Sequence, residues 1–316
     1  MGARRRSRGS PVVQVGVSTP VPVATQPSVL LVRLGWANLI ANIGIVITGA
    51  AVRLTGSGLG CPTWPRCTDE SYVVHQELGI NGAIEFGNRM LTFVLVVIAV
   101  ACWVAALQQV RSDRAGADRR PLALATVIAL GIPAQAVIGG ITVRTDLNPW
   151  VVSLHLVVSL TIIGVCVALV DHLVGRPRAW ATSRSRRAAL LTLGLGTVVL
   201  YLGTIVTGSG PHSGDLEARR TGLDPATMSH VHAWVVYALV AATVLTLVLA
   251  RRDGNVPLFV AARTLLAIEL LQGAIGFTQY FLDLPVALVL LHMLGAALTA
   301  ASLAWVVLST RARRTN

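Results

Sequence analysis

Eight long apolar stretches constrain the fold of this chain more than any other feature of its sequence. They cover approximately residues 31–52, 82–107, 121–142, 150–172, 188–207, 228–250, 258–279 and 284–309. About 20 apolar residues are enough to cross a bilayer, and because lipid offers no partner for backbone polar groups, each stretch is expected to be a helix. Charged residues make up only 13% of the chain, against about a quarter in a soluble domain. The sequence therefore predicts an all-α membrane protein with eight transmembrane helices.

The placement of the basic residues predicts how the chain lies in the membrane. All 26 are arginines. Nineteen lie in the N-terminal segment up to Arg33 and near residues 111–120, 176–187, 251–252 and 311–314, whereas five lie in the alternate loops. Because basic loops stay on the cytoplasmic side, we expect a multi-pass protein of the bacterial cytoplasmic membrane with both termini in the cytoplasm. The same distribution argues against nucleic acid as the reason for the net charge of +12.

The residues before the first apolar stretch predict a tail. Residues 1–29 are rich in arginine, contain no acidic residue and lack a continuous apolar core, so they are not a secretory signal. We expect a disordered cytoplasmic tail, with a mitochondrial presequence as the alternative. A second short cytoplasmic tail is expected over 311–316.

Motifs that recur in the same order indicate an internal duplication. The sequence TGSG begins at Thr55 and again at Thr207, and glutamine-led motifs begin at Gln135 and at Gln272. A histidine follows each glutamine at the same spacing, His155 after the first and His292 after the second. The order predicts two four-helix bundles in parallel orientation, an N-terminal half over 30–175 and a C-terminal half over 188–310. Chance similarity between apolar helices is the alternative.

Four polar residues lie at one depth in the stretches that run from outside to inside. Asn88, His155, His232 and His292 lie about four to eight residues into their stretches, or roughly 6–12 Å at 1.5 Å per residue. Two neutral imidazoles on facing helices suit axial ligation of heme iron. The small residues that follow His292, from Gly295 onward, would leave room for the macrocycle. Structural histidines or a zinc site, which would need three or four ligands, are the alternatives for His232 and His292.

The N-terminal half differs from this pattern because its second stretch begins with Glu85, Asn88 and Arg89. An amide is a poor iron ligand, so a heme held by His155 would keep its opposite face open. Glu85 lies one helical turn before Asn88 and shares its side of the helix. A carboxyl group there could donate or accept a proton. The alternative is a Glu85–Arg89 pair that only satisfies two charges near the interface.

The four cysteines divide into two kinds. Cys61 and Cys67 share the first outer loop, where an oxidising compartment makes a short disulfide plausible. Two free thiols or a metal pair are the alternatives. Cys102 and Cys166 lie toward the inner ends of their stretches and are expected to be small buried apolar residues.

Together these features resemble the heme A synthase family. The resemblance is carried by TGSGLGCPTWPRC from Thr55, by IEFGNR from Ile84, and by the histidines in stretches four, six and eight. It covers nearly the whole chain from about residue 30. The resemblance implies oxidation of a methyl group of heme O to a formyl group, by two successive hydroxylations and loss of water, which gives heme A for terminal oxidases. A membrane farnesyltransferase, the heme O synthase, and an electron donor that the sequence does not identify are the implied partners, besides membrane lipid.

The resemblance also implies roles for individual residues. His232 and His292 would ligate a permanent heme b in the C-terminal half. The substrate heme site would consist of His155 and Glu85 as catalytic residues with Asn88 and Arg89 beside them. By the same resemblance, the cysteines of the first outer loop would form a disulfide.

The chain departs from the family pattern at two places. Many members have histidine where Asn88 stands, and we expect this asparagine to leave the substrate iron five-coordinate. The loop 208–227 lacks the second cysteine pair of some members. A diheme membrane cytochrome that relays electrons from quinol is the main alternative function. A transporter with parallel repeats is a third.

Overall fold

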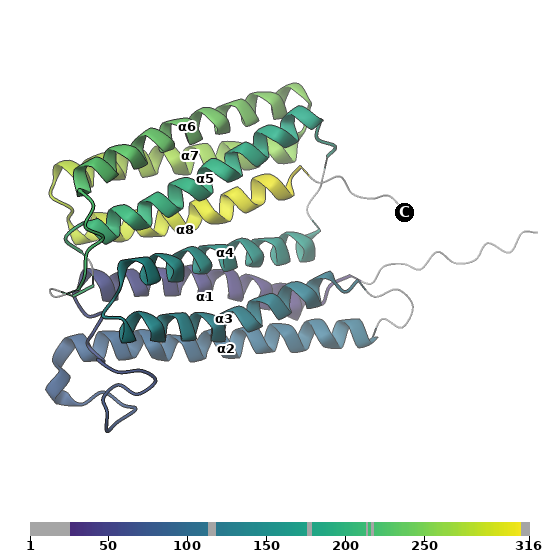
Figure 1. Cartoon of the computed structure of the whole chain (residues 1–316). Coiled ribbons are helices and arrows are strands. Elements are labelled where there is room, and N and C mark those ends of the chain that lie inside the picture. Colours follow the sequence, from purple (N-terminus) through teal and green to yellow (C-terminus); the bar gives the residue numbers. More distant parts are fainter. Residues whose placement is uncertain (1–25, 113–117, 176–178, 213, 216–217, 311–316) are drawn as a thin grey trace, which may run out of the picture.

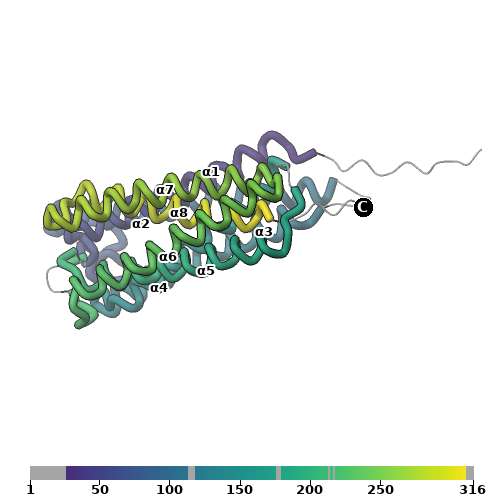
Figure 2. The backbone as a smooth tube through the Cα atoms, turned by 90° about the horizontal axis from the view of Figure 1, so that it is seen from above, coloured from purple at the N-terminus to yellow at the C-terminus, as the bar shows by residue number. Residues whose placement is uncertain are grey.

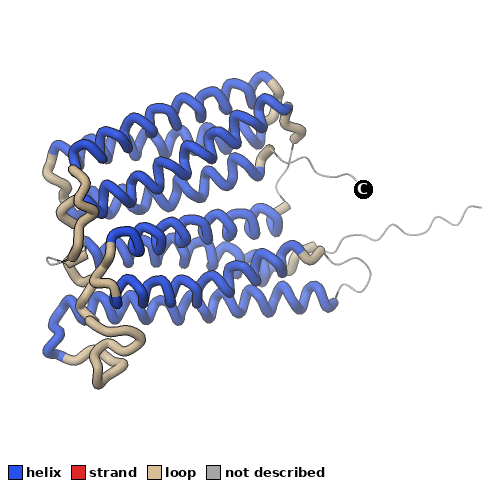
Figure 3. The backbone as a smooth tube through the Cα atoms, in the orientation of Figure 1, coloured by secondary structure: helices blue, strands red, loops and turns tan. Residues whose placement is uncertain are grey.

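The computed structural model of the chain describes residues 26–112, 118–175, 179–212, 214–215 and 218–310. They form helices joined by loops, with no strand among these residues (Figure 1, Figure 3). The helices are α1 (Val29–Leu54), η1 (Gln76–Leu78), α2 (Gly79–Ser112), α3 (Arg120–Arg144), α4 (Pro149–Val174), α5 (Ser183–Ser209), α6 (Pro225–Arg252), α7 (Val256–Phe281) and α8 (Val286–Leu308). Eight of them, all but the short η1, are long and apolar enough to cross a membrane. The predicted all-α membrane protein with eight transmembrane helices is confirmed.

Most helices extend beyond the predicted apolar stretches, because polar residues continue the helix or cap it. Helix α5 begins at Ser183 rather than at 188, and the Thr182 side chain accepts a hydrogen bond from the N–H of Ser185 (3.2 Å). Such a cap satisfies one of the free N–H groups of the first helical turn. Helix α1 already begins at Val29, the last residue of the predicted tail. The rest of that tail up to residue 25, and the tail 311–316, lie outside the described residues.

The helices lie side by side in two groups of four (Figure 1, Figure 2). In the first group α1 packs on α2 and α4, and α3 packs on α2 and α4; in the second, α5 packs on α6 and α8, and α7 packs on α6 and α8. Contacts of α4 and α1 with α8, and of α4 with α5, join the groups. Because the number of spans is even, residues 26 and 310 lie at one end of the bundle. We call this the inner end, and the opposite one the outer end.

The two short outer loops share an unusual backbone conformation. Asp146 and Leu147, between α3 and α4, have φ values of 51° and 54°, and Asp283 and Leu284, between α7 and α8, have 54° and 60°. Residues other than glycine rarely adopt this left-handed backbone conformation. The offset between the two pairs in the sequence equals the offset between the two glutamine motifs. The same strained turn at the same offset is what a duplication predicts.

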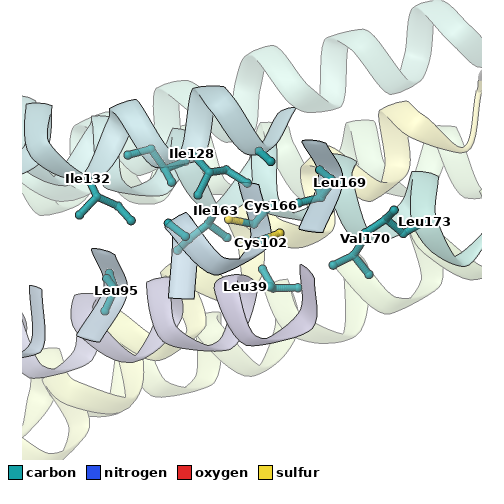
Figure 4. Packing of buried hydrophobic residues seen from close by; sticks show 14 of the residues in the cluster. Leu39, Leu95, Cys102, Ile128, Ile132, Ile163, Cys166, Leu169, Val170 and Leu173 are labelled. Carbon is teal, nitrogen blue, oxygen red and sulfur yellow. The ribbon is translucent and has the colours of Figure 1, made fainter. Parts of the chain in front are cut away.

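A buried apolar cluster fills the inner part of the first group of helices (Figure 4). Ile128, Ile163 and Leu169 belong to it, and the free thiols Cys102 and Cys166 are buried among them. The expectation that these two cysteines are small buried apolar residues is confirmed. Because the cluster lies toward the inner end, the outer part of the first group remains for polar side chains.

Candidate active site

A cavity of about 560 Å³ lies in the outer part of the first group of helices. Its lining is mostly apolar, and it includes all four residues of the predicted substrate site: Glu85, Asn88, Arg89 and His155. Side chains from α1 to α4 form most of the wall, and residues of α5, α8 and the outer loops complete it. Its size falls within the range of about 300–1,000 Å³ that is usual for small-molecule and cofactor sites.

His155 is held on α4 with one ring nitrogen free. A Cβ atom added at Gly139 of α3 would lie 3.3 Å from its Cε1, so this glycine permits the close approach of α3 to the ring. The Gln135 side chain donates hydrogen bonds to the His155 carbonyl oxygen (3.0 Å) and to Ser159 Oγ (2.9 Å). Among the described residues, no group hydrogen-bonds the buried Nδ1 of His155. Buried polar atoms are normally paired, so the protein itself leaves one hydrogen-bonding position of this ring unfilled.

Asn88 shares the cavity with His155, but its amide oxygen is engaged. Thr48 of α1 donates a hydrogen bond from Oγ1 to Asn88 Oδ1 at 2.8 Å. The bond fixes the side chain to α1. Asn88 therefore contributes a held amide group to the cavity.

Glu85 and Arg89 form the ion pair that the sequence analysis gave as an alternative. Glu85 Oε1 accepts from Arg89 Nη2 (2.5 Å) and Nε (3.1 Å), and Glu85 Oε2 accepts from the backbone N–H of Cys61 (2.6 Å). Arg89 also donates to the carbonyl oxygens of Cys61 (2.9 Å), Thr63 (3.0 Å) and Arg66 (3.1 Å). The pair thus lines the cavity and also fastens the first outer loop to α2.

The first outer loop contains the disulfide that the sequence analysis favoured. Cys61 and Cys67 are bonded to each other and buried. Between them, the Trp64 ring packs on Gly140 of α3 and occupies the place of a Cβ atom there. Trp64 and Tyr72 line the cavity, so this loop closes part of its outer side. This contact was not predicted from the sequence, although a tryptophan between two cysteines and the Gly-Gly pair of α3 were both visible.

His232 of α6 and His292 of α8 are brought together in the second group of helices. They are close enough for a charge on His232 to act on His292. Each ring faces a glycine, since an added Cβ would lie 3.4 Å from His232 Cε1 at Gly203 and 3.5 Å from His292 Cε1 at Gly276. No described residue hydrogen-bonds the buried Nδ1 of either ring. Two neighbouring imidazoles on separate helices fit axial ligation of one heme iron.

A zinc site would need three or four ligands. The described part of the chain contains no cluster of three or more histidine, cysteine, aspartate or glutamate side chains that could hold a metal ion. Because the described part of the chain offers no third ligand beside these two imidazoles, the pair favours heme over zinc.

The expected role of Gly295 is wrong. The Gln272 side chain occupies the space beside this glycine, so that a Cβ atom at 295 would overlap it. Gly295 therefore accommodates an amide from α7 and leaves no room there for a macrocycle. The close approaches to the histidines come from Gly203 and Gly276 instead. Gly139 and Gly276 are related by the offset of the glutamine motifs, which makes the helix packing around His155 and His292 equivalent.

Comparison with known proteins shows the family of the chain. A sequence model of the family described as "Cytochrome oxidase assembly protein" matches residues 32–306. The chain is 24% identical to a heme A synthase from Shewanella oneidensis, over 84% of this chain and 93% of that protein. It is 26% identical to a heme A synthase from Caulobacter sp. (strain K31), over 85% of this chain and 94% of that protein. Because the family match covers most of the chain, the chain belongs to the heme A synthase family of cytochrome oxidase assembly proteins.

Proposed function

We propose that this protein is an oxidoreductase that converts heme O into heme A by oxidising a methyl substituent to a formyl group. Two successive hydroxylations of that methyl group followed by loss of water account for the change. The observation that carries the proposal is the cavity that His155 shares with the carboxylate of Glu85 and the amide of Asn88, instead of with a second imidazole. A single iron ligand beside a carboxylate suits a heme that reacts.

The proposal assigns different roles to the two groups of helices. The C-terminal half, 188–310, would hold a permanent heme b between His232 and His292. A heme with two histidine ligands supplies one-electron transfer when it is bound. The N-terminal half, 30–175, would hold the substrate.

Within the N-terminal half, the chain's own residues would position the substrate and move protons. His155, which lines the cavity, would ligate the substrate iron through its imidazole. Asn88, held by Thr48, would leave the other face of that iron open, because an amide is a poor ligand. Glu85 would exchange a proton at its carboxylate oxygens when water is lost from the hydroxylated carbon, and Arg89 would keep that carboxylate in place. Trp64 and the disulfide loop would limit access of water from the outer side.

The proposal also covers the membrane in which the protein lies, the source of its substrate and the source of its electrons. An excess of arginine at the inner end supports a bacterial cytoplasmic membrane with both termini in the cytoplasm. The substrate would come from a heme O synthase in the same membrane, and electrons would come from a donor of unknown identity.

The test is pigment analysis in a bacterial host that makes heme O but no heme A. The full chain and its Glu85→Gln variant are each expressed in that host, and the hemes are extracted and separated. We expect heme A with the wild-type chain and mostly unconverted heme O with the variant. A wild-type chain that carries heme but leaves heme O unchanged would contradict the proposal and favour the electron-relaying cytochrome.

A further inference from the structure

Two cations line the cavity of the first group of helices, and they differ in whether their charge is compensated. The guanidinium of Arg89 is paired with Glu85 and donates to three loop carbonyl groups. The other cation is Arg53, in the last turn of α1. Among the described residues, no salt bridge involves Arg53. The cavity therefore contains one neutralised guanidinium and one that has no described counter-ion.

The Arg53 side chain reaches across to the second group of helices. Its Nε donates to the carbonyl oxygen of His212 (2.6 Å), and its Nη2 donates to the carbonyl oxygen of Thr207 at the end of α5 (2.9 Å). A guanidinium has five N–H donors in a fixed plane. These two bonds fix its direction and leave donors for a further acceptor, in a wall of the cavity that is otherwise mostly apolar.

The surroundings of Arg53 are positive. Arg220, from the loop after α5, is close enough to act electrostatically on it. The pKa of His212 in the same loop lies below its ordinary value, because of burial first and then because of the positive charges of Arg53 and Arg220. Two cations that repel each other beside an apolar cavity favour the binding of a ligand that brings an anionic group to them.

We propose that Arg53 binds a propionate carboxylate of the porphyrin substrate and so sets the orientation of the ring in the cavity. The inference rests on the proposed function, since it takes heme as the occupant. An arginine forms paired hydrogen bonds with a carboxylate, which fix geometry as well as charge. Ile205 stands where the offset of the TGSG motifs places the equivalent of Arg53 in the second half. The positive charge of Arg53 therefore occurs only in the N-terminal half and has no equivalent at this position of the C-terminal half.

This role makes Arg53 a positioning residue at the junction of the two groups of helices. The propionate edge of the ring would face the outer end, where Glu85 also lies. In heme O the methyl group that is oxidised shares a pyrrole ring with one propionate. Fixing that propionate therefore limits where the methyl group lies relative to Glu85.

The experiment compares two probes that differ only in their carboxylates, iron(III) protoporphyrin IX and its dimethyl ester. Full-length protein purified with its resident heme is titrated with each probe, and binding is followed by Soret difference spectra. We expect the wild type to bind the diacid roughly ten- to a hundredfold more tightly than the ester, as one hydrogen-bonded charge pair would give. Arg53→Met should abolish that preference by weakening the diacid alone. Arg53→Lys should keep part of it, because the charge remains while the paired geometry is lost.

Arg144 provides a matched control. It is an exposed arginine at the outer end of α3 that donates to the Trp64 carbonyl oxygen (3.1 Å) and does not line the cavity. Arg144→Met should keep the wild-type preference for the diacid. An unchanged preference in Arg53→Met, or an equal loss of both probes in that variant, would overturn the inference. A wild type that makes heme A but binds both probes equally would refute the role of Arg53 alone, whereas failure to make heme A refutes the proposed function.

Discussion

Replacing Glu85 by glutamine removes a charge from the site with little change in volume. The carboxylate accepts three hydrogen bonds, two from Arg89 and one from the N–H of Cys61. Glutamine keeps one acceptor oxygen, so its NH₂ group must face either the guanidinium or the Cys61 N–H, and both are donors. The substitution therefore loses at least one hydrogen bond to a charged group and leaves Arg89 without its counter-ion.

The expected cost follows from the exposure of the pair. Breaking a fully buried ion pair costs about 3–5 kcal/mol, and a hydrogen bond to a charged group contributes about 1.5–3 kcal/mol. The Glu85 side chain is 7% exposed, but that of Arg89 is 19% exposed and partly solvated. We therefore expect Glu85→Gln to lower the free energy of unfolding by about 2–3 kcal/mol.

The assay is a double-mutant cycle in detergent with Glu85→Gln, Arg89→Met and the double variant. Unfolding by denaturant gives stability, and extracted pigments give heme A output. Arg89→Met should lose similar stability but keep the carboxylate, so its heme A output should fall less than that of Glu85→Gln. The coupling energy between the two sites should exceed about 1 kcal/mol. An equal loss of heme A output in both single variants would show that Glu85 has only a structural role. An unchanged free energy of unfolding would refute the hydrogen bonds between Glu85 and Arg89.

Three further perturbations test other parts of the account. His292→Ala should abolish the low-spin absorption of the resident heme, whereas His155→Ala should keep it, as visible spectra of the purified variants will show. Gly139→Val should push a side chain against the His155 ring, because even a Cβ atom would lie 3.3 Å from it; porphyrin titration should show weaker binding with the resident heme intact. The pKa of Asp253 lies below its ordinary value because Ser185 and Thr182 donate to its carboxylate. Its contribution to stability is thus present above the unfolded-state pKa and lost as pH falls through the lower pKa of the folded state. The protection factors of the first amides of α5 should therefore fall only in acid.

The sequence was sufficient for the membrane fold and for the depth of the histidines. Both follow from local properties, the length of the apolar stretches and the regular rise of a helix along its axis. In the structure His155, His232 and His292 lie six or seven residues after the first residues of α4, α6 and α8, at similar depth. The disulfide of the first outer loop was also foreseen.

Contacts between distant segments were not predictable from local pattern. Gly295 looked like open space, but Gln272 from the preceding helix fills it. The bond from the Cys61 N–H to Glu85 depends on how the outer loop folds back over α2. Arg53 belongs to the first group of helices by sequence, yet its partners are carbonyl groups of the second. In each case the contact depends on the conformation of a long side chain or of a loop.

The visible absorption spectrum of the purified wild-type protein shows whether histidines from two helices bind one heme. We expect a Soret band and low-spin signals of one heme with two histidine ligands, which disappear in His232→Ala and in His292→Ala. A wild-type protein that stays colourless after heme is supplied, or one whose bis-histidine spectrum survives both substitutions, would contradict the binding of one heme by these two histidines.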